Sequence, residues 1–340
     1  MLIAADATYT LDPNPTGIAV YSSEVLERMA AAHPAEHFLF CYRPHRFLRA
    51  LGQPLHPNVW RWPMLEFGPR PGTLFHGLNQ RLPRRRWPRQ VATFHDLFVM
   101  SHEYSTPEFR RRFTDQARHA AENADRIIAV SRFTAGEVER CLGVEPGRIR
   151  VVYHGVRLPP AIREEREKLV LTVGSIQKRK NTARLVRCFA FMPPGWRLVL
   201  AGGRGYGADE TLREIESSPR RPDIDVADRV SEAQLADLYQ RASIFAFPSL
   251  DEGFGIPILE AMANGVPVVT ANRSAMPEVC GDAGLQVDPE SDDELAAALC
   301  RLAGEEALRD DLASRGRARA LEFSWDRAAA ETWKVYEELL

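Results

Sequence analysis

The sequence has few cysteines, and none are arranged to bind a metal or to build a disulfide framework. Five cysteines are scattered through 340 residues, and no two of them form a Cys-x-x-Cys pair. This usage is typical of a reduced chain with buried thiols. The sequence also has no apolar run of about 18 residues and no charged segment leading into a short apolar one. We therefore expect no membrane span, no signal peptide and a cytoplasmic location.

Glycine-based phosphate motifs are missing as well. A nicotinamide enzyme needs Gly-x-Gly-x-x-Gly after its first strand, but the segment after the strand-like Leu2–Asp6 contains a single glycine, Gly17. The glycine-rich Ala201–Gly207 follows an apolar run, yet it has neither that spacing nor the Lys-Ser/Thr of a P-loop. Two interpretations of this segment stay open: a plain tight turn, or a close backbone approach to a phosphate or sugar.

Signals for a metal site or a nucleophile are equally sparse. Asp223 and Asp225 form an Asp-x-Asp pair, as metal–nucleotide sites do, but they lie in a polar segment bounded by proline. We predict a solvated loop there and no metal site. No Ser/His/Asp or Cys/His arrangement supports acyl transfer.

Charge is divided unevenly along the chain. Residues 1–158 hold 21 Arg and 15 Asp/Glu, giving +6, whereas residues 159–340 hold 23 Lys/Arg and 31 Asp/Glu, giving −8. Two basic segments, Arg81–Gln90 and Phe109–Phe113, stand out in the first half. They are either solvated faces or a surface for an acidic membrane or a phosphorylated substrate. No recognition motif accompanies them, so nucleic acid is not an expected partner.

Apolar strand-like runs alternate with helical patterns such as Pro107–Asn123, which predicts parallel α/β architecture. The proline pair and charge run of Val156–Lys168 indicate a linker, after which the alternation restarts. From Asp292 to the end the pattern is helical. The chain is therefore predicted to form two doubly wound domains with a helical tail. Ligands of such sheets bind at the carboxyl ends of the strands.

Two glutamates, Glu252 and Glu260, flank a predicted strand–loop–helix junction. The run Ser243–Ser249 has strand length, Pro257 suits the first position of a helix, and Asn264-Gly265 would end that helix. A carboxylate one turn into a helix can accept two hydrogen bonds from a ribose diol. Free loop amides and the helix dipole would attract a sugar or phosphate oxygen.

Three adjacent cations lie at the start of the helix predicted after the first strand-like run of the second half. Lys178, Arg179 and Lys180 lie where cations are normally unfavourable, which indicates that an anion such as a diphosphate binds there. A solvated basic turn is the alternative. His95 and Asp96 end another apolar strand, a position that favours a functional role over a structural one.

The segment Pro248–Val269, with its two glutamates separated by seven residues, resembles the signature of the retaining glycosyltransferases of family 4. Similar blocks occur in order along most of the chain. They include Thr16–Ala30, Leu74–Pro83, Phe94–Leu97, Ile127–Thr134, Arg148–Val156, Gly174–Asn181, Ala233–Ser249, Ser274–Pro289 and Phe323–Leu339. The resemblance implies an α/β GT-B fold, with two Rossmann-like domains facing across a cleft. Residues 1–158 would bind the acceptor, residues 159–323 the donor, and a helix at about 324–340 would cross back.

The resemblance also implies roles for individual residues. Glu260 would bind the donor ribose, and Lys180 would neutralise the departing diphosphate. Ser175 stands where many members have a phosphate-binding arginine, so Arg179 or Lys178 would share that work. The remaining implied positions are Glu252, Gly253, Phe254, Gly255 and Ile256 around the transferred sugar, Gly17 near the diphosphate, and His95, Asp96 and Asn79 on the acceptor side.

The function implied is retaining, metal-independent transfer of a hexosyl group from a nucleotide-sugar, a co-substrate rather than a cofactor. The acceptor would be a saccharide, a lipid-linked glycan or a natural product. A phosphorylase-like GT-B protein is disfavoured, because nothing resembles a pyridoxal-phosphate lysine site. An inactive nucleotide-sugar-binding or scaffold protein is the alternative from another class. The basic first half would allow peripheral contact with the inner face of a membrane. The donor sugar, its base and the linkage are not indicated.

Overall fold

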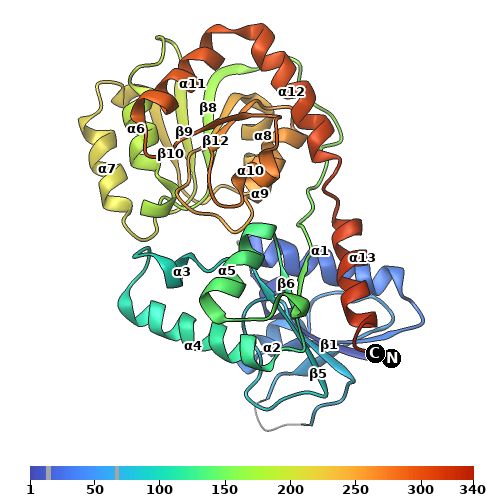
Figure 1. Cartoon of the computed structure of the whole chain (residues 1–340). Coiled ribbons are helices and arrows are strands. Elements are labelled where there is room, and N and C mark those ends of the chain that lie inside the picture. Colours follow the sequence, from blue (N-terminus) through green and yellow to red (C-terminus); the bar gives the residue numbers. More distant parts are fainter. Residues whose placement is uncertain (13–16, 66–68) are drawn as a thin grey trace. The chain divides into compact units, whose positions relative to one another are not determined.

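A computed structural model describes residues 1–12, 17–65 and 69–340 of the chain (Figure 1). The chain divides into two compact units. The first contains Met1–Ser101, Thr106–Gly155 and Ser324–Leu340, and the second contains His102–Ser105 and Val156–Phe323. The sequence predicted a domain boundary after residue 158, and the structure places it three residues earlier, after Gly155. The short segment His102–Ser105, expected in the first domain, groups with the second unit instead.

The first unit is built on a seven-stranded sheet, parallel throughout, in the order β3-β2-β1-β4-β5-β6-β7. Its strands are β1 (Leu2–Asp6), β2 (His37–Tyr42), β3 (Val59–Pro63), β4 (Leu74–Gly77), β5 (Arg89–Phe94), β6 (Arg126–Ala129) and β7 (Ile149–Val151). Its helices are α1 (Gly17–Ala32), α2 (Pro44–Ala50), α3 (Phe98–Ser101), α4 (Pro107–Asn123), α5 (Arg132–Leu142) and α13 (Trp325–Glu337).

The second unit has a six-stranded parallel sheet in the order β10-β9-β8-β11-β12-β13. Its strands are β8 (Glu167–Val173), β9 (Arg197–Ala201), β10 (Ile224–Ala227), β11 (Ala242–Phe247), β12 (Val268–Ala271) and β13 (Leu285–Val287). Its helices are α6 (Thr182–Phe189), α7 (Ala208–Ser217), α8 (Glu232–Arg241), α9 (Ile256–Ala263), α10 (Met276–Cys280), α11 (Asp292–Gly304) and α12 (Glu306–Ala320). The predicted pair of doubly wound α/β units is confirmed.

Local capping signals explain several helix boundaries. Thr106 accepts a hydrogen bond from the amide of Phe109 at the start of α4, and Pro107 occupies its first turn. Ser231 and Gln234 form a reciprocal capping box at α8, as such spacing predicts. These side chains satisfy amides that have no partner inside the helix, so each helix starts where its sequence predicts.

The C-terminal helix α13 belongs to the first unit, where it packs on α1. The hydroxyl of Tyr336 is 2.6 Å from Nδ1 of His76 on β4. Where the chain returns, Gly155 lies so close to the backbone of Trp325 that an added Cβ would be 2.2 Å from its nitrogen. Only glycine allows this approach.

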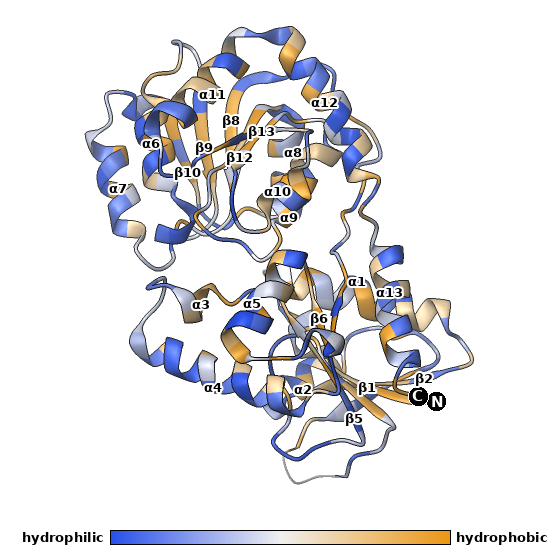
Figure 2. Cartoon of the chain, in the orientation of Figure 1, coloured by the Kyte–Doolittle hydropathy of each residue, from blue (hydrophilic) through white to orange (hydrophobic). Residues whose placement is uncertain are grey.

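Both sheets are hydrophobic, whereas the helices carry hydrophilic residues on their outer faces (Figure 2). Sequence reasoning missed three strands at or near sheet edges: β3, β10 and β13. The solvated loop predicted at Asp223–Asp225 is wrong, because Ile224–Ala227 forms edge strand β10 beside β9. Ile224 is buried while its polar neighbours face outward, and a four-residue edge strand with two acids has little apolar signal. No helix in the described ranges is long and apolar enough to cross a membrane.

In each sheet the chain order reverses between two adjacent strands. The reversal falls between β1 and β4 in the first unit and between β8 and β11 in the second. The loops that leave these strand pairs at their carboxyl ends diverge and open a crevice where α/β proteins bind ligands. The loops after β8 and β11 hold the two motifs singled out in the second half of the sequence.

Candidate functional site

The loops after β8 and β11 are joined by hydrogen bonds. The amide of Leu250 donates to the carbonyl of Arg179 at 2.8 Å. The side chain of Asn181 donates to the carbonyl of Pro248 at 3.1 Å. Lys178–Lys180 form a 3-10 turn, and Asn181, with φ of 56°, ends it. Helix α6 then begins at Thr182. The two sequence motifs therefore form one structure.

A buried ion cluster lies at this junction. Oε1 of Glu252 is 2.6 Å from Nζ of Lys180 and 2.8 Å from Nη1 of Arg179. Arg179 also donates to the carbonyl of Asp251. Burial raises the pKa of Glu252, but attraction to Arg179 and Lys180 outweighs it and lowers that pKa to about 2. Glu252 is therefore ionised at neutral pH, and the cations expected to await an anion already hold one.

The three cations differ in exposure. Arg179 is buried, and Lys180 is partly buried with its ammonium 4.5 Å from the centre of the Phe247 ring. Lys178 is exposed, and its ammonium has no partner among the residues that the structure describes. Ser175, which stands where many family 4 members have a phosphate-binding arginine, is also exposed. Lys178 is thus the cation of the three that is free to meet a ligand without first leaving a carboxylate.

The loop Gly253–Ile256 presents backbone rather than side chains. The Phe254 ring is buried and packs edge-on against Phe323, with ring centroids 6.0 Å apart. Gly255 precedes α9 with φ of 106°, a conformation that side chains other than glycine's rarely adopt. Pro257 has no amide hydrogen and the amide of Ile258 donates to the carbonyl of Gly255 at 2.9 Å, so the amides of Gly255 and Ile256 are the donors left without an acceptor in the described part of the chain. This geometry leaves amide donors, reinforced by the helix dipole, for an oxygen-rich ligand.

Glu260 lies one turn into α9, as its spacing predicts, and is half-buried. The hydroxyl of Tyr239 on α8 donates to its Oε2 at 2.8 Å. Burial raises the pKa of Glu260, and the Tyr239 hydrogen bond opposes that rise. Oε1 has no recorded partner in the described part of the chain and can accept from a ligand hydroxyl. Tyr239 was missed in the sequence, since a tyrosine inside an amphipathic helix has the pattern of a core residue.

His95 directly follows β5 in the first unit and is buried. Its Nε2 is 2.9 Å from the carbonyl of Leu78, and its Nδ1 is 3.4 Å from Nε2 of His154. Burial lowers the pKa of His95 to about 4, so the ring is neutral at pH 7. Because the Leu78 carbonyl can only accept, the proton of the neutral ring lies on Nε2. Nδ1 is then an acceptor.

The other predicted positions of the first unit lie at the same sheet edge. Asn79 follows β4, and its amide nitrogen donates to the hydroxyl of Tyr9 at 2.6 Å. Its Oδ1 is buried and has no partner within the described ranges. Asp96 is half-buried beside His95. Gly17 is the exposed first residue of α1, directly after residues 13–16, which lie outside the described ranges.

The aspartates of the Asp-x-Asp pair are occupied by arginines. Asp223 Oδ2 is 2.6 Å from Nε of Arg220, and Asp225 forms an ion pair with Arg197 on the neighbouring strand. No group of three His, Cys, Asp or Glu residues suited to a metal ion occurs among residues 1–12, 17–65 and 69–340.

The fold is shared with solved glycosyltransferase structures. Sucrose-phosphate synthase from Thermosynechococcus elongatus superimposes with a TM-score of 0.80 at 21% identity, covering 100% of this chain and 99% of that chain. Anabaena HepE in complex with UDP and glucose gives a TM-score of 0.73 at 19% identity, covering 99% and 98%. These similarities identify the fold as GT-B, a class defined by two Rossmann-like domains.

Sequence comparison identifies the family. Glycosyltransferase Family 4 matches residues 15–158, and Glycosyl transferases group 1 matches residues 159–319. O-antigen chain mannosyltransferase B of Escherichia coli is 30% identical over 95% of this chain and 96% of its own length. A D-inositol 3-phosphate glycosyltransferase of Xylanimonas cellulosilytica is 33% identical over 63% of this chain and 57% of its own. The chain belongs to the group 1, family 4 glycosyltransferases, which confirms the resemblance seen in its sequence and makes it an enzyme of that class.

Proposed function

We propose that the enzyme transfers a sugar from a nucleotide-sugar to a glycan acceptor, with retention of the anomeric configuration and without a metal ion. Family membership supports the class of reaction. The name of the Escherichia coli relative and the UDP bound to HepE support a glycan acceptor and a nucleotide-sugar donor. The observation that carries the proposal is the buried Glu252 cluster with Arg179 and Lys180 at the switch point of the second sheet.

The donor nucleotide is assigned to the second unit. Oε1 of Glu260 accepts from the ribose diol, while Tyr239 holds the other oxygen of the carboxylate. Lys178 and Lys180 meet the diphosphate. Arg179 is a positioning residue, because it is buried against Glu252 and the carbonyl of Asp251. These contacts support Lys178 over Arg179 as the substitute for the arginine absent at Ser175.

The transferred sugar is assigned to Glu252 and the amides of Gly255 and Ile256. Glu252 remains a carboxylate at neutral pH and so acts as a hydrogen-bond acceptor for sugar hydroxyls. Its two cations fix its orientation before the ligand arrives. This preorganisation lowers the cost of aligning the site during the reaction.

In the proposed reaction the bond between the anomeric carbon and the diphosphate oxygen breaks, and its electron pair leaves with the diphosphate. The acceptor hydroxyl oxygen bonds to the same face of that carbon, and its proton passes to the departing phosphate. Negative charge grows on the leaving group, where the ammonium of Lys180 and the α9 amides stabilise it. In the first unit, Oδ1 of Asn79 presents an acceptor atom to a hydroxyl group, and His95, whose Nδ1 lies 3.4 Å from Nε2 of His154, lines the acceptor side.

A peripheral membrane position is part of this proposal. Helix α4 carries exposed Arg111, Arg112 and Arg118, and the loop after β4 carries exposed Arg84–Arg86. Such a basic surface is attracted to anionic lipids, by about 1 kcal/mol per cation at the surface. Vesicle sedimentation tests it: retention on anionic but not neutral vesicles is expected, and equal recovery from both would contradict it.

The test begins with a thermal-shift screen over UDP-, GDP-, dTDP- and ADP-sugars. The right donor, at 100 times its dissociation constant, stabilises the second unit by roughly 2.7 kcal/mol. Donor turnover is then measured in excess EDTA, and the anomeric configuration of the product is read by NMR. Turnover that is lost with EDTA and restored by Mn²⁺ or Mg²⁺ would overturn metal independence. An inverted product would overturn retention, and stabilisation without turnover would indicate a binding protein instead.

A further inference from the structure

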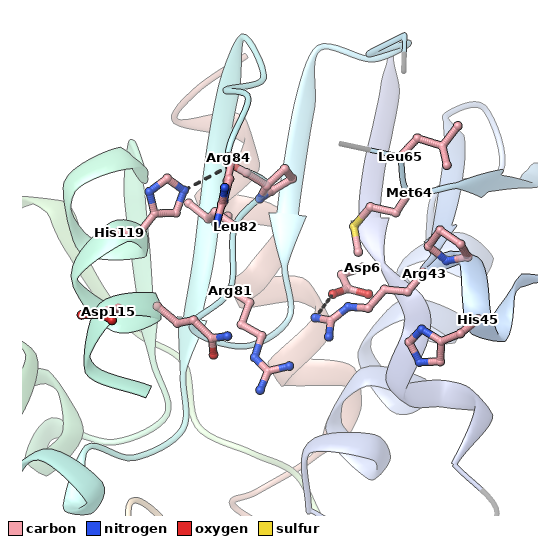
Figure 3. A pocket seen from close by; sticks show the side chains of 13 residues that line it. Asp6, Arg43, His45, Met64, Leu65, Arg81, Leu82, Arg84, Asp115 and His119 are labelled. Carbon is pink, nitrogen blue, oxygen red and sulfur yellow. Dashed lines mark hydrogen bonds and ion pairs between the residues drawn. The ribbon is translucent and has the colours of Figure 1, made fainter. Parts of the chain in front are cut away.

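The first unit contains a cavity of about 770 Å³ that the donor chemistry does not use. It lies at the carboxyl ends of β1, β2, β3 and β4, and it is bounded by α2 and α4 (Figure 3). Charged and apolar side chains line it, among them Asp6, Arg43, Arg81, Arg84, Met64 and Leu82. A cavity of this volume accommodates a ligand the size of a phosphorylated monosaccharide.

Its basic side chains come from separate elements. Arg43 follows β2 and is held by Asp6, with 3.2 Å between Nη2 and Oδ2. Arg81 and Arg84 come from the loop after β4, and neither has an ion-pair partner within the described residues. Figure 3 shows Arg81 extending toward the space beside Arg43. Asp115 on α4 is an exposed carboxylate in the lining, so Arg81 and Arg84 leave an excess of positive charge.

Arg81 carries the strongest sign of an unfilled site. Its Nε is buried and donates to no acceptor in the part of the chain that the structure describes. A buried donor without an acceptor loses its hydration and gains nothing in return, which costs about 1–3 kcal/mol. A ligand that accepts from this nitrogen removes that cost. The guanidinium fork fits a phosphate better than any neutral group, because it donates two parallel hydrogen bonds.

The other wall of the cavity is apolar. Met64, Leu65 and Leu82 line it, so a ligand that fills the space has a carbon skeleton as well as an anionic group. The cavity shares its sheet edge with Asn79, whose carbonyl accepts from the amide of Arg81 at 2.7 Å. Asn79 and Arg81 therefore belong to the same turn after β4.

We propose that this cavity binds a phosphate group carried by the acceptor, with Arg81 and Arg84 as its ligands and the apolar wall against the adjoining sugar or lipid carbons. The inference rests on the proposed function, since it takes the first unit as the acceptor side. A soluble sugar phosphate and a lipid-linked phosphate share this chemistry, and the test below separates them.

The test measures binding to the full chain by ligand-observed NMR, with inorganic phosphate, glucose 6-phosphate and glucose as probes. A second arm uses phosphatidylcholine vesicles with and without a polyprenyl phosphate. Arg81→Gln and Arg84→Gln are each expected to weaken phosphate binding about tenfold or more. Arg84 is exposed, so its replacement leaves folding unaffected. The control is Arg85→Gln, an exposed arginine of the same loop outside the lining.

Loss of binding in both pocket variants, with binding retained in Arg85→Gln, supports the proposal. Preference for glucose 6-phosphate over inorganic phosphate then indicates a soluble acceptor, whereas Arg81-dependent binding to the polyprenyl phosphate vesicles indicates a lipid-linked one. Equal loss in Arg85→Gln overturns the proposal in favour of general surface charge. Unchanged binding in both pocket variants overturns it by placing the anion outside the cavity. None of these readouts uses turnover, so a chain that binds phosphate through Arg81 but no nucleotide-sugar contradicts the proposed function alone.

Discussion

Three histidines of the first unit and one glutamate of the second are all buried, yet only the glutamate is charged at neutral pH. Burial lowers the pKa of His76 to about 3 and of His95 to about 4, and it lowers the pKa of His154 well below its usual value. Burial also disfavours the charged form of Glu252, but attraction to Arg179 and Lys180 outweighs it and lowers the pKa of this carboxyl. The sign of each outcome depends on whether an opposite charge lies within hydrogen-bond distance.

This difference matches the chemistry proposed for each unit. On that proposal, a neutral imidazole and an amide oxygen serve an acceptor that consists of hydroxyl groups, because they attract no ions. The second unit keeps cations in place by pairing them with Glu252, which avoids leaving bare charges buried when no ligand is bound. On the proposed function, the donor diphosphate would meet Lys178 and Lys180 beside a carboxylate that is already present.

Removing the charge that sustains this cluster gives the largest expected effect. Glu252→Gln removes the carboxylate that pairs with buried Arg179 and partly buried Lys180, and we expect the free energy of unfolding of the second unit to fall by about 3–5 kcal/mol. Urea unfolding followed by regional hydrogen exchange measures it. The control is Glu290→Gln, which breaks an exposed pair with Arg273 and should cost less than about 1 kcal/mol. Equal effects of the two substitutions would show that the buried cluster does not form in solution.

Acid should open the two units in a fixed order. The histidines take up protons in the unfolded state below pH 6.5 but resist them in the folded state until their lowered pKa values, so the first unit loses stability as pH falls from 6.5. For His95 alone the loss by pH 4 is roughly 3 kcal/mol. Glu252 makes its contribution above pH 4.5 and loses it as pH falls toward 2. Glu260, with its raised pKa, acts in the opposite direction.

Hydrogen exchange at stepped pH, corrected for intrinsic rates, measures this order region by region. Protection should fall in β4 and β5 between pH 6 and 4 while β8 and β11 remain protected. His45→Gln, which removes an exposed histidine of the same unit, should leave the profile unchanged. Simultaneous opening of both sheets, or earlier opening of the second, would refute the assignment of neutral histidines.

The smallest expected effect concerns how Glu260 is held. Tyr239→Phe removes the hydroxyl that donates to Oε2. The affinity for the donor's nucleoside diphosphate should fall by about 0.5–1.5 kcal/mol, the usual net worth of one hydrogen bond. Tyr42→Phe, a buried phenol in the first unit, is the matched control and should leave affinity unchanged in calorimetry. A Tyr239→Phe protein with wild-type affinity would mean that Glu260 needs no such support.

The starts of several helices were predictable because capping residues next to them in the sequence determine where they begin. The bounds of α4 and the capping box of α8 follow from Thr106, Pro107, Ser231 and Gln234. Strand β10 was missed because a short edge strand needs hydrogen bonds from its neighbour more than apolar side chains of its own. Its exposed aspartates gave the segment the composition of a loop.

The site was predictable in its members but not in their partners. Lys180 and Glu252 were each singled out from their own loop, while their contact depends on the adjacency of β8 and β11, strands far apart in sequence. The same long-range packing brings Tyr239 to Glu260 and Arg81 to the cavity lining. Sequence spacing within one motif contains no information about such contacts.

The central claim is that the second unit binds the nucleotide while the first unit serves the transfer step. One measurement tests it most directly: affinity for the donor's nucleoside diphosphate and the rate of sugar transfer, compared in wild type, Lys180→Ala and His95→Ala. Lys180→Ala should weaken binding and lower transfer by about 10²–10³-fold, because its ammonium meets charge that grows on the leaving group. His95→Ala should lower transfer by about 10²-fold with affinity unchanged. Equal loss of affinity in folded His95→Ala, or transfer at the wild-type rate in Lys180→Ala, would contradict the account.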